Sequence, residues 1–343
     1  IDKVRAAGYE AEAVKVLLSS ADAAVNLENL AFAKGANHGR LKAAYELPAD
    51  LNSWETQPLE VDLAVEAPDL GAFAAPDGDV RLSGLLRLTG QAKVRERNVT
   101  GSLQAEAAGV DFNGLPVRRA KLQVDVVENR ATVSELDVVF DDSNTLRGGG
   151  GVQIGEAMAY GGHLDLQMKN LAVLRPVLPP DVPEMGGSLT AVWKGSGNVR
   201  DSRHQGEISL ALTGGRWGEQ KNLTAGFHAS YDADAITIPD FAVSAGRSGE
   251  ARFSLFWKNN RLQVSDLAVR QGRMTLLTGS LDIPLHLAKA SDVDALIPSD
   301  EPLTVRLRSE RVDLAAVARN LGQKDPPLTG SLDLTVDARG TLD

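Results

Sequence analysis

The feature that most constrains this chain is a unit that joins one short helix to one alternating strand. In its last copy, Asp313 is placed to cap a helix with its carboxylate, and apolar residues then recur on one helical face. After a Pro-Pro loop the period changes, and Leu332, Leu334 and Val336 alternate with polar residues. Alternation with a period of two is typical of a β-strand with one apolar face. This copy therefore predicts a helix that leads into a half-covered strand.

Two earlier copies of the unit begin at Asp69 and Asn170. From the cap residue to the glycine that opens the strand, the offsets are 84 − 69 = 15, 187 − 170 = 17 and 330 − 313 = 17 residues. The copies themselves are unevenly spaced, by 170 − 69 = 101 and 313 − 170 = 143 residues. This combination indicates a degenerate repeat with a variable number of intervening strands. We predict one continuous segment, 1–343, with approximate repeat units at 14–160, 161–302 and, incomplete, 303–343.

The rest of the chain reads almost entirely as β-structure. Residues 1–13 are rich in Ala and Glu, and we expect a short helix there or the end of a preceding repeat. Three hairpins are expected at turns 128–129, 232–234 and 259–260, because Asn and Asp tolerate the left-handed backbone of such turns. Short strands spaced by about a dozen residues are typical of a sandwich, a barrel or an open meander.

Composition favours the open meander. Aromatic residues make up only 5% of the chain, whereas the cores of sandwiches usually include bulky aromatics. The expected helices are too few and too short to cover the strands. We therefore predict an all-β fold, an elongated antiparallel β-meander curled into a groove, or β-taco, with an apolar interior and a few short helices between repeats. Leaving about 1,000 Å² of that interior in water would cost roughly 25 kcal/mol, so we expect a ligand or partner to fill it.

The predicted lining of the groove consists of the inward-facing apolar residues of the alternating strands. The aromatic members of this set fit a packed core as well as they fit a groove lining. The set is Leu164, Leu166, Met168, Leu189, Trp193, Ile208, Leu210, Leu212, Phe227, Phe253, Leu255, Trp257, Leu281, Ile283, Leu332, Leu334 and Val336.

Residues with catalytic or metal-binding chemistry are dispersed. The histidines have no second His or Cys at metal-ligand spacing. The glycines 148–151 lack the Lys-Ser/Thr of a phosphate loop and predict a bend or bulge, and 141–144 predicts a turn rather than a calcium loop. Asp292 and Asp294 fit a helix cap, and an acid–base pair there has no supporting residue. We expect no enzymatic activity, no catalytic residue, no metal and no cofactor.

The charge balance argues against a nucleic-acid partner. The net charge is −10, and Lys and Arg are scattered singly along strands, whereas phosphate neutralisation requires clustered cations. Cysteine is absent, which excludes disulfides and is compatible with an oxidising or a reducing compartment. The sequence has no apolar run of membrane-spanning length and no signal peptide at its start. We interpret the chain as an internal segment of a longer protein.

The repeated unit resembles the repeats of TamB and the AsmA-like proteins, which are of the repeating β-groove type. The shared pattern is a Leu-x-Leu strand, a short Asp/Asn-Leu helix, a loop, Gly-Ser-Leu-x-Leu, and a later Gly-Thr-Leu or Gly-Ser-Gly. It is clearest at 162–198 and 304–343 and weaker at 61–107, and 36–60 matches poorly. The resemblance implies an apolar β-taco in the periplasm, in a protein anchored in the inner membrane of a Gram-negative bacterium.

Three functions stay open at this point. The resemblance implies a non-enzymatic conduit that carries phospholipid, with acyl chains in the groove, between the inner and outer membranes. The alternative is a scaffold for assembling outer-membrane β-barrel or autotransporter proteins, with a barrel partner bound through a C-terminal part beyond this segment. A third, an enzyme on a β-helix acting on polysaccharide, would require a carboxylate cluster that the sequence does not show.

Overall fold

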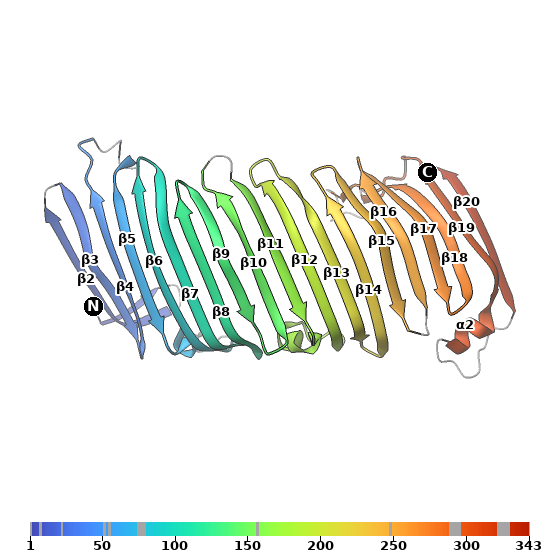
Figure 1. Cartoon of the computed structure of the whole chain (residues 1–343), viewed down its shortest axis with the longest axis horizontal. Helices are drawn as coiled ribbons and strands as arrows, with labels where there is room; N and C mark the ends of the chain where they lie inside the picture. Colours follow the sequence, from blue (N-terminus) through green and yellow to red (C-terminus); the bar gives the residue numbers. More distant parts are fainter. Residues whose placement is uncertain are drawn as a thin grey trace. The chain divides into compact units, whose positions relative to one another are not determined.

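The structure, a computed structural model, consists of antiparallel strands joined by tight turns and a few helical turns (Figure 1). It describes residues 2–6, 9–21, 23–50, 53, 56–73, 80–155, 158–246, 249–287, 296–320 and 330–342. Contacts divide the chain into two units. Unit 1 comprises 1–169, 173–182 and 196–201, and unit 2 comprises 170–172, 183–195 and 202–343.

In unit 1, each strand pairs antiparallel with the next strand in sequence, which is a meander. The predicted all-β antiparallel fold is therefore confirmed for this unit. The strands are β1 (Asp2–Ala6), β2 (Tyr9–Ala21), β3 (Ala24–Lys34), β4 (Asn37–Glu46), β5 (Leu59–Ala67), β6 (Leu82–Arg95), β7 (Asn98–Phe112), β8 (Leu115–Val127), β9 (Arg130–Val139), β10 (Asn144–Gln153) and β11 (Ala159–Met168).

Unit 2 repeats the same arrangement, with sequential antiparallel pairing from β13 to β20. Most of β12 also belongs to this unit. The strands are β12 (Met185–Asn198), β13 (Arg203–Trp217), β14 (Gln220–Tyr231), β15 (Ala235–Ala245), β16 (Glu250–Lys258), β17 (Arg261–Gln271), β18 (Met274–Pro284), β19 (Leu303–Asp313) and β20 (Ser331–Gly340).

The predicted helix-to-strand units form at all three places. The 3-10 helix η2 (Leu70–Phe73) precedes β6, η3 (Leu171–Val177) precedes β12, and the α-helix α2 (Leu314–Asn320) precedes β20. Each begins at its predicted cap. The side chain of Asp69 accepts a hydrogen bond from Gly71 N at 3.0 Å, that of Asn170 from Ala172 N at 3.1 Å, and that of Asp313 from Ala316 N at 3.0 Å.

The glycine that opens the following strand has the same backbone conformation in the first two units. The φ angles of Gly84 and Gly187 are +109° and +102°, which side-chain-bearing residues rarely adopt. A Cβ at Gly84 would lie 2.6 Å from Val110 Cα, and one at Gly187 would lie 2.6 Å from Gly215 Cα. Glycine is required at both positions because the neighbouring backbone occupies the space of a side chain. The first two repeat units therefore share the glycine conformation and also the close contact between this glycine and the backbone of the next strand.

The turn predictions are confirmed, and the N-terminal helix prediction is wrong. Both residues of the 128–129 and 259–260 turns have positive φ, as the expected hairpins require.

Residues 2–6 and 9–21 form β1 and β2 instead of a helix. The helix propensity of Ala and Glu is a few tenths of a kcal/mol per residue, which cross-strand pairing of β2 with β3 readily outweighs. The Pro-Pro loop, Asp292 and Asp294 lie outside the described residues.

The protein has little buried core for its length. Its accessible surface is 21629 Å². A compact protein of this length exposes about 13,500 Å², and two separate domains of half the length about 16,000 Å². Among the described residues, the buried apolar side chains are Ala67, Met168, Leu171, Ala229, Pro284 and Val312. Most apolar side chains of the strands are therefore half-exposed, and neither unit is a sandwich with two mutually buried faces.

Candidate functional site

The strand register gives unit 1 one continuous apolar face. Residues directly opposite each other in an antiparallel pair lie on the same face, so the register can be followed from strand to strand. One such row crosses β2 to β11 through Val14, Phe32, Gly39, Val65, Leu88, Ala105, Leu122, Leu136, Gly148 and Leu164.

A second row runs beside the first, two residues away on each strand except β9, where a register shift makes the spacing 136 − 133 = 3 residues. It contains no polar side chain and passes through Val16, Leu30, Leu41, Leu63, Gly90, Leu103, Val124, Val133, Gly150 and Gly162. At about 4.8 Å per strand, each row extends about 43 Å across the sheet. An exposed apolar surface of this extent marks an interaction site for a ligand, a membrane or a partner protein.

Unit 2 also has an apolar face, and it differs in carrying an aromatic row. Leu210, Phe227, Phe241 and Phe253 lie opposite one another on β13 to β16. The ring centroids of Phe241 lie 5.9 Å from those of Phe227 and 4.6 Å from those of Phe253, in stacked geometry. The adjacent row is aliphatic, with Ile238, Leu255, Val264, Leu281, Val305 and Ala338.

Two of the three tryptophans of unit 2 have their indole N–H hydrogen-bonded within the protein. Trp193 Nε1 donates to Tyr231 Oη at 2.8 Å, and Trp257 Nε1 donates to the carbonyl of Leu285 at 2.8 Å. Neither indole N–H is therefore presented to a ligand. The face offers an apolar surface without hydrogen-bond donors at these two positions, which suits an aliphatic chain.

Most of the predicted lining residues lie in cross-strand rows with other apolar residues, and Leu189 and Trp193 are on β12. Leu164, Leu166 and Met168 belong to unit 1, and the other members of the set belong to unit 2. Most are half-exposed, and Leu164, Leu332 and Leu334 are exposed by 38%, 42% and 39%. Met168 differs, because it is only 1% exposed and packs opposite the buried Asn144.

The predicted lining set omits Phe241 and every residue of β2 to β10, although the apolar alternation of several of these strands is visible in the sequence. Phe241 follows Pro239 and Asp240, and the β14–β15 register shifts between Phe227 and Ser230. This irregularity interrupts the alternation that would have revealed the residue. The strand register is needed to show that these residues form continuous rows, because alanine and glycine dilute the alternation in strands such as β7 and β10.

The opposite face of unit 1 is polar and carries cross-strand ion pairs. Lys121 Nζ lies 3.3 Å from Glu106 Oε1, and Arg119 and Arg147 lie 2.7 and 3.2 Å from the two carboxylate oxygens of Asp137. The exposed Lys121–Glu106 pair contributes little to stability, about 0–1 kcal/mol, whereas the side chain of Asp137 is only 14% exposed and is held by two arginines. These ion pairs favour one strand register, since a slip of one residue would place charges on the apolar face.

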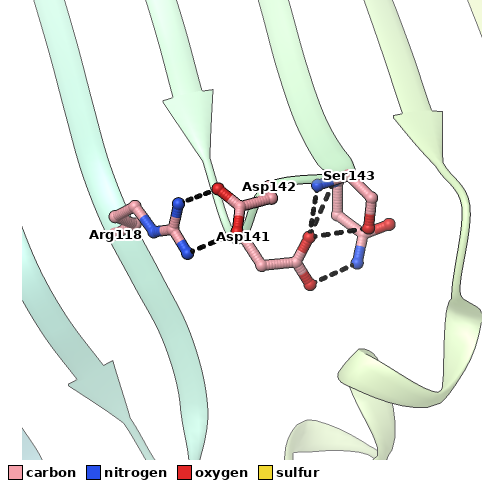
Figure 2. A network of polar contacts seen from close by, with 5 residues as sticks. Arg118, Asp141, Asp142 and Ser143 are labelled. Carbon is pink, nitrogen blue, oxygen red and sulfur yellow. Dashed lines mark hydrogen bonds and ion pairs between the residues drawn. The ribbon is translucent and has the colours of Figure 1, made fainter.

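The turn at 141–144 is a closed hydrogen-bond network, as Figure 2 shows. Asp141 Oδ1 accepts hydrogen bonds from Ser143 N, Ser143 Oγ and Asn144 N, and Oδ2 accepts one from Asn144 Nδ2. The Ser143 backbone bond lowers the pKa of Asp141 most; burial opposes it, and the other bonds lower it further. The predicted turn is confirmed, and both oxygens of Asp141 are used within it.

Arg118 and Asp142 form a two-bond ion pair beside this turn (Figure 2). The hydrogen bonds from the Arg118 guanidinium, and next its positive charge, lower the pKa of Asp142.

The predicted bulge in the glycine run is also confirmed, because the β9–β10 register shifts between Gly148 and Gly150. Both features shape the sheet and present no reactive group.

Within the described ranges, no cluster of three or more His, Asp or Glu side chains is arranged to hold a metal ion. In the same ranges, no helix combines the length and hydropathy needed to cross a bilayer. The feature that stands out is thus the contrast between a polar face and an uncovered apolar face in each unit. Such a face can bind an apolar ligand along its length without catalysis.

The resemblance of the repeated unit to TamB and the AsmA-like proteins stays a prediction. The helix-to-strand units that suggested it are present in the structure, but a shared architecture is not a shared function. Comparisons with protein-family models, with curated proteins and with solved structures found no match to this chain.

Proposed function

We propose that the apolar faces of the two units bind the acyl chains of phospholipids, and that the protein carries lipid between membranes without catalysis. The observation that supports this most strongly is the pair of uninterrupted apolar rows in unit 1, which no layer of described residues covers. A covering layer would leave these side chains buried, whereas they are half-exposed.

The energetics suit movement of lipid along each face. A sixteen-carbon chain transferred from a bilayer into water costs on the order of 12 kcal/mol, at about 0.8 kcal/mol per methylene. Contact with a continuous aliphatic surface removes much of that cost. Because successive positions along a row are chemically alike, a chain can slide without crossing a large barrier, while its headgroup stays in water. The parent protein would then act in the periplasm, as the resemblance implies.

The binding step is tested with a matched pair of double variants. Leu164→Asp/Leu210→Asp places one carboxylate on the apolar face of each unit. His163→Asp/Ala211→Asp places a carboxylate one residue away in each strand, on the polar face. Titration of a dansyl-labelled fatty acid should show an affinity at least about tenfold lower for the apolar-face variant, because a carboxylate there is desolvated by the bound chain. The polar-face variant should bind like the wild type.

Two controls keep this test decisive. Circular dichroism and urea unfolding must show that both variants fold, and phospholipid extracted from the purified wild type must be quantified by mass spectrometry. Equal affinity in the two variants, or a wild type that neither binds the fatty acid nor purifies with phospholipid, would exclude the proposal.

Transport is tested separately from binding. The wild type should accelerate transfer of pyrene-labelled phospholipid between donor and acceptor vesicles, and the apolar-face variant should not. A protein that binds lipid without accelerating transfer would be a lipid-binding protein and not a conduit. The assembly-scaffold alternative depends on the backbone of a sheet edge and stays a separate prediction.

A further inference from the structure

One end of the apolar face of unit 2 carries aromatic side chains that have a polar atom. The last apolar row before turns 232–234 and 259–260 crosses β14 to β18 through Tyr231, Ile236, Trp257, Leu262 and Ile283. Trp193 reaches this row from β12, because its Nε1 donates to Tyr231 Oη at 2.8 Å. We call Trp193, Tyr231 and Trp257 the aromatic rim. The other tryptophan of the unit, Trp217, lies at the far end of β13, opposite the polar Gln220.

Contacts within unit 2 hold the aromatic rim in place. Both of its indole N–H groups are hydrogen-bonded within the unit. Two glycines make room for the rings, because a Cβ at Gly206 would lie 2.9 Å from Tyr231 Oη and one at Gly195 would lie 2.7 Å from the Trp193 ring. The rings are therefore ordered before any ligand binds, which lowers the entropic cost of binding.

Tyr231 has a hydrogen-bond donor that the described part of the chain does not use. Its Oη accepts from Trp193, and its own hydrogen has no acceptor among the described residues. A phenol hydroxyl both donates and accepts, so an oxygen atom of a ligand can complete its bonding. The row contains no charged side chain, since Lys258 and Arg261 occupy the alternate positions, on the opposite face. The acceptor that fits best is therefore an uncharged one, such as a carbonyl oxygen.

The opposite end of the same face is covered at β17 to β19. Gln271, Ser309 and Val312 are only 2%, 5% and 4% exposed there. Gln271 Nε2 donates to the carbonyl of Val317 at 3.4 Å, so α2 lies against the face at this end. The two ends of the face therefore differ, and for these strands the open end is the one with the aromatic rim.

We propose that the aromatic rim binds the ester region of a phospholipid, with Tyr231 Oη donating to an ester carbonyl oxygen and the acyl chain directed inward along the strands. In membranes, Tyr and Trp gather at the level where hydrocarbon meets the headgroups, because each has an apolar ring and a polar atom. This orientation rests on the proposed lipid binding. It places the headgroup beyond turns 232–234 and 259–260, in water, and the methyl end of the chain on the apolar face.

The spacing of the rows supports this orientation. Phe227 and Phe253 lie four residues inward from Tyr231 and Trp257, as 231 − 227 = 4 and 257 − 253 = 4. Four residues of a strand span about 13 Å. The hydrocarbon of one membrane leaflet is about 15 Å thick, half of the full core. A chain whose ester lies at the aromatic rim therefore ends near the stacked phenylalanine row.

The orientation is tested by photocrosslinking the full chain with two palmitoyl lysophospholipids that carry a diazirine at different depths. A diazirine next to the ester should label Ile236 and Leu262, and one at the methyl end should label Phe241 and Phe253. Mass spectrometry of the digested protein locates the labels. The reverse pattern, or the same pattern with both lipids, would overturn the orientation. Labels in no apolar row would contradict lipid binding itself, so the two failures are distinguishable.

The donor role of Tyr231 is tested with Tyr231→Phe and two competitors, palmitoyl lysophosphatidylcholine and its hexadecyl ether, which lacks the carbonyl. Each competes with the labelling of Leu262 by the first lipid. The concentration of ester needed for half-competition should rise about fivefold in the variant, because one neutral hydrogen bond is lost, and that of the ether should not change. Tyr45→Phe, on β4 of unit 1, is the matched control and should change neither value.

Two results would overturn this role. An equal loss for the ester and the ether would show that Tyr231 only supports the Trp193 ring. No loss for either lipid would show that its hydroxyl donates no bond to the ligand. Urea unfolding of Tyr231→Phe checks that the variant is folded under the conditions of the assay.

Discussion

At the scale of single residues, the repeat units are most alike in the backbone conformation of the glycine at the start of the strand. Gly84 and Gly187 share a φ angle near +105° and a close contact with backbone of the next strand. Gly330, in the third unit, has a φ of +114°, but a Cβ there would meet nothing within 4 Å. The sequence offsets predicted that these positions correspond. They could not predict the close approach, which depends on pairing with residues 110 − 84 = 26 and 215 − 187 = 28 positions away.

This difference gives a matched stability prediction. Gly187→Ala should lower the free energy of unfolding by at least about 2 kcal/mol, because it adds a backbone clash to an unfavourable φ. Gly330→Ala incurs only the unfavourable φ, so its cost should be clearly smaller. Urea unfolding of both variants measures the difference. Equal destabilisation would show that the contact with Gly215 does not constrain the strand.

The turn at Asp141 gives a prediction for pH. Its hydrogen bonds lower the folded-state pKa, so the stabilisation is fully present above the unfolded value of about 4 and is lost as the pH falls through the folded value. Asp141→Ala should therefore destabilise the protein at neutral pH, by about 1–3 kcal/mol for the lost bonds, and by less near pH 3. Urea unfolding at both pH values tests this. A difference between wild type and variant that does not shrink in acid would contradict it.

At the scale of elements, local chemistry predicted the turns, caps and strand character well. Asn259 and Asn260 predicted their hairpin because asparagine favours the left-handed backbone of such turns. Asp313 predicted the start of its helix because a cap bonds to a backbone N–H only three residues away, Ala316 N. Residues 1–13 were assigned wrongly because propensity is weaker than pairing. Phe241 was missed because a register shift conceals its face.

The cap of α2 can be tested by itself. Asp313→Ala removes the acceptor for Ala316 N and should cost about 0.5–2 kcal/mol of local stability. Hydrogen exchange followed by mass spectrometry should show faster exchange in α2 and little change in β18. Asp333→Ala is not a suitable control, because the Asp333 carboxylate accepts a hydrogen bond from Arg311 N. Asp337→Ala serves instead, because its contacts with Arg306 and Arg339 at 3.8 and 3.7 Å are exposed ion pairs that contribute little to stability. Unchanged exchange in α2 would show that the helix is held by other contacts.

At the scale of the whole molecule, the large accessible surface and sparse core predict an unusual heat capacity of unfolding. A compact protein of 343 residues would have a value of about 4–5 kcal/mol/K, most of it from newly exposed apolar surface. Here much of that surface is already exposed in the folded state, so calorimetry should give a clearly lower value. A value within the compact range would mean that the apolar faces are covered in solution.

The central claim is that acyl chains lie on the apolar face, and the most direct measurement is photocrosslinking with a phospholipid that carries a photoreactive group in its acyl chain. We predict labels on apolar-row residues such as Leu103, Leu122 and Leu136, and none on their polar-face neighbours Gln123 and Glu135. Mass spectrometry of the digested protein identifies the labelled positions. Labels distributed equally over both faces, or confined to the polar face, would contradict the account.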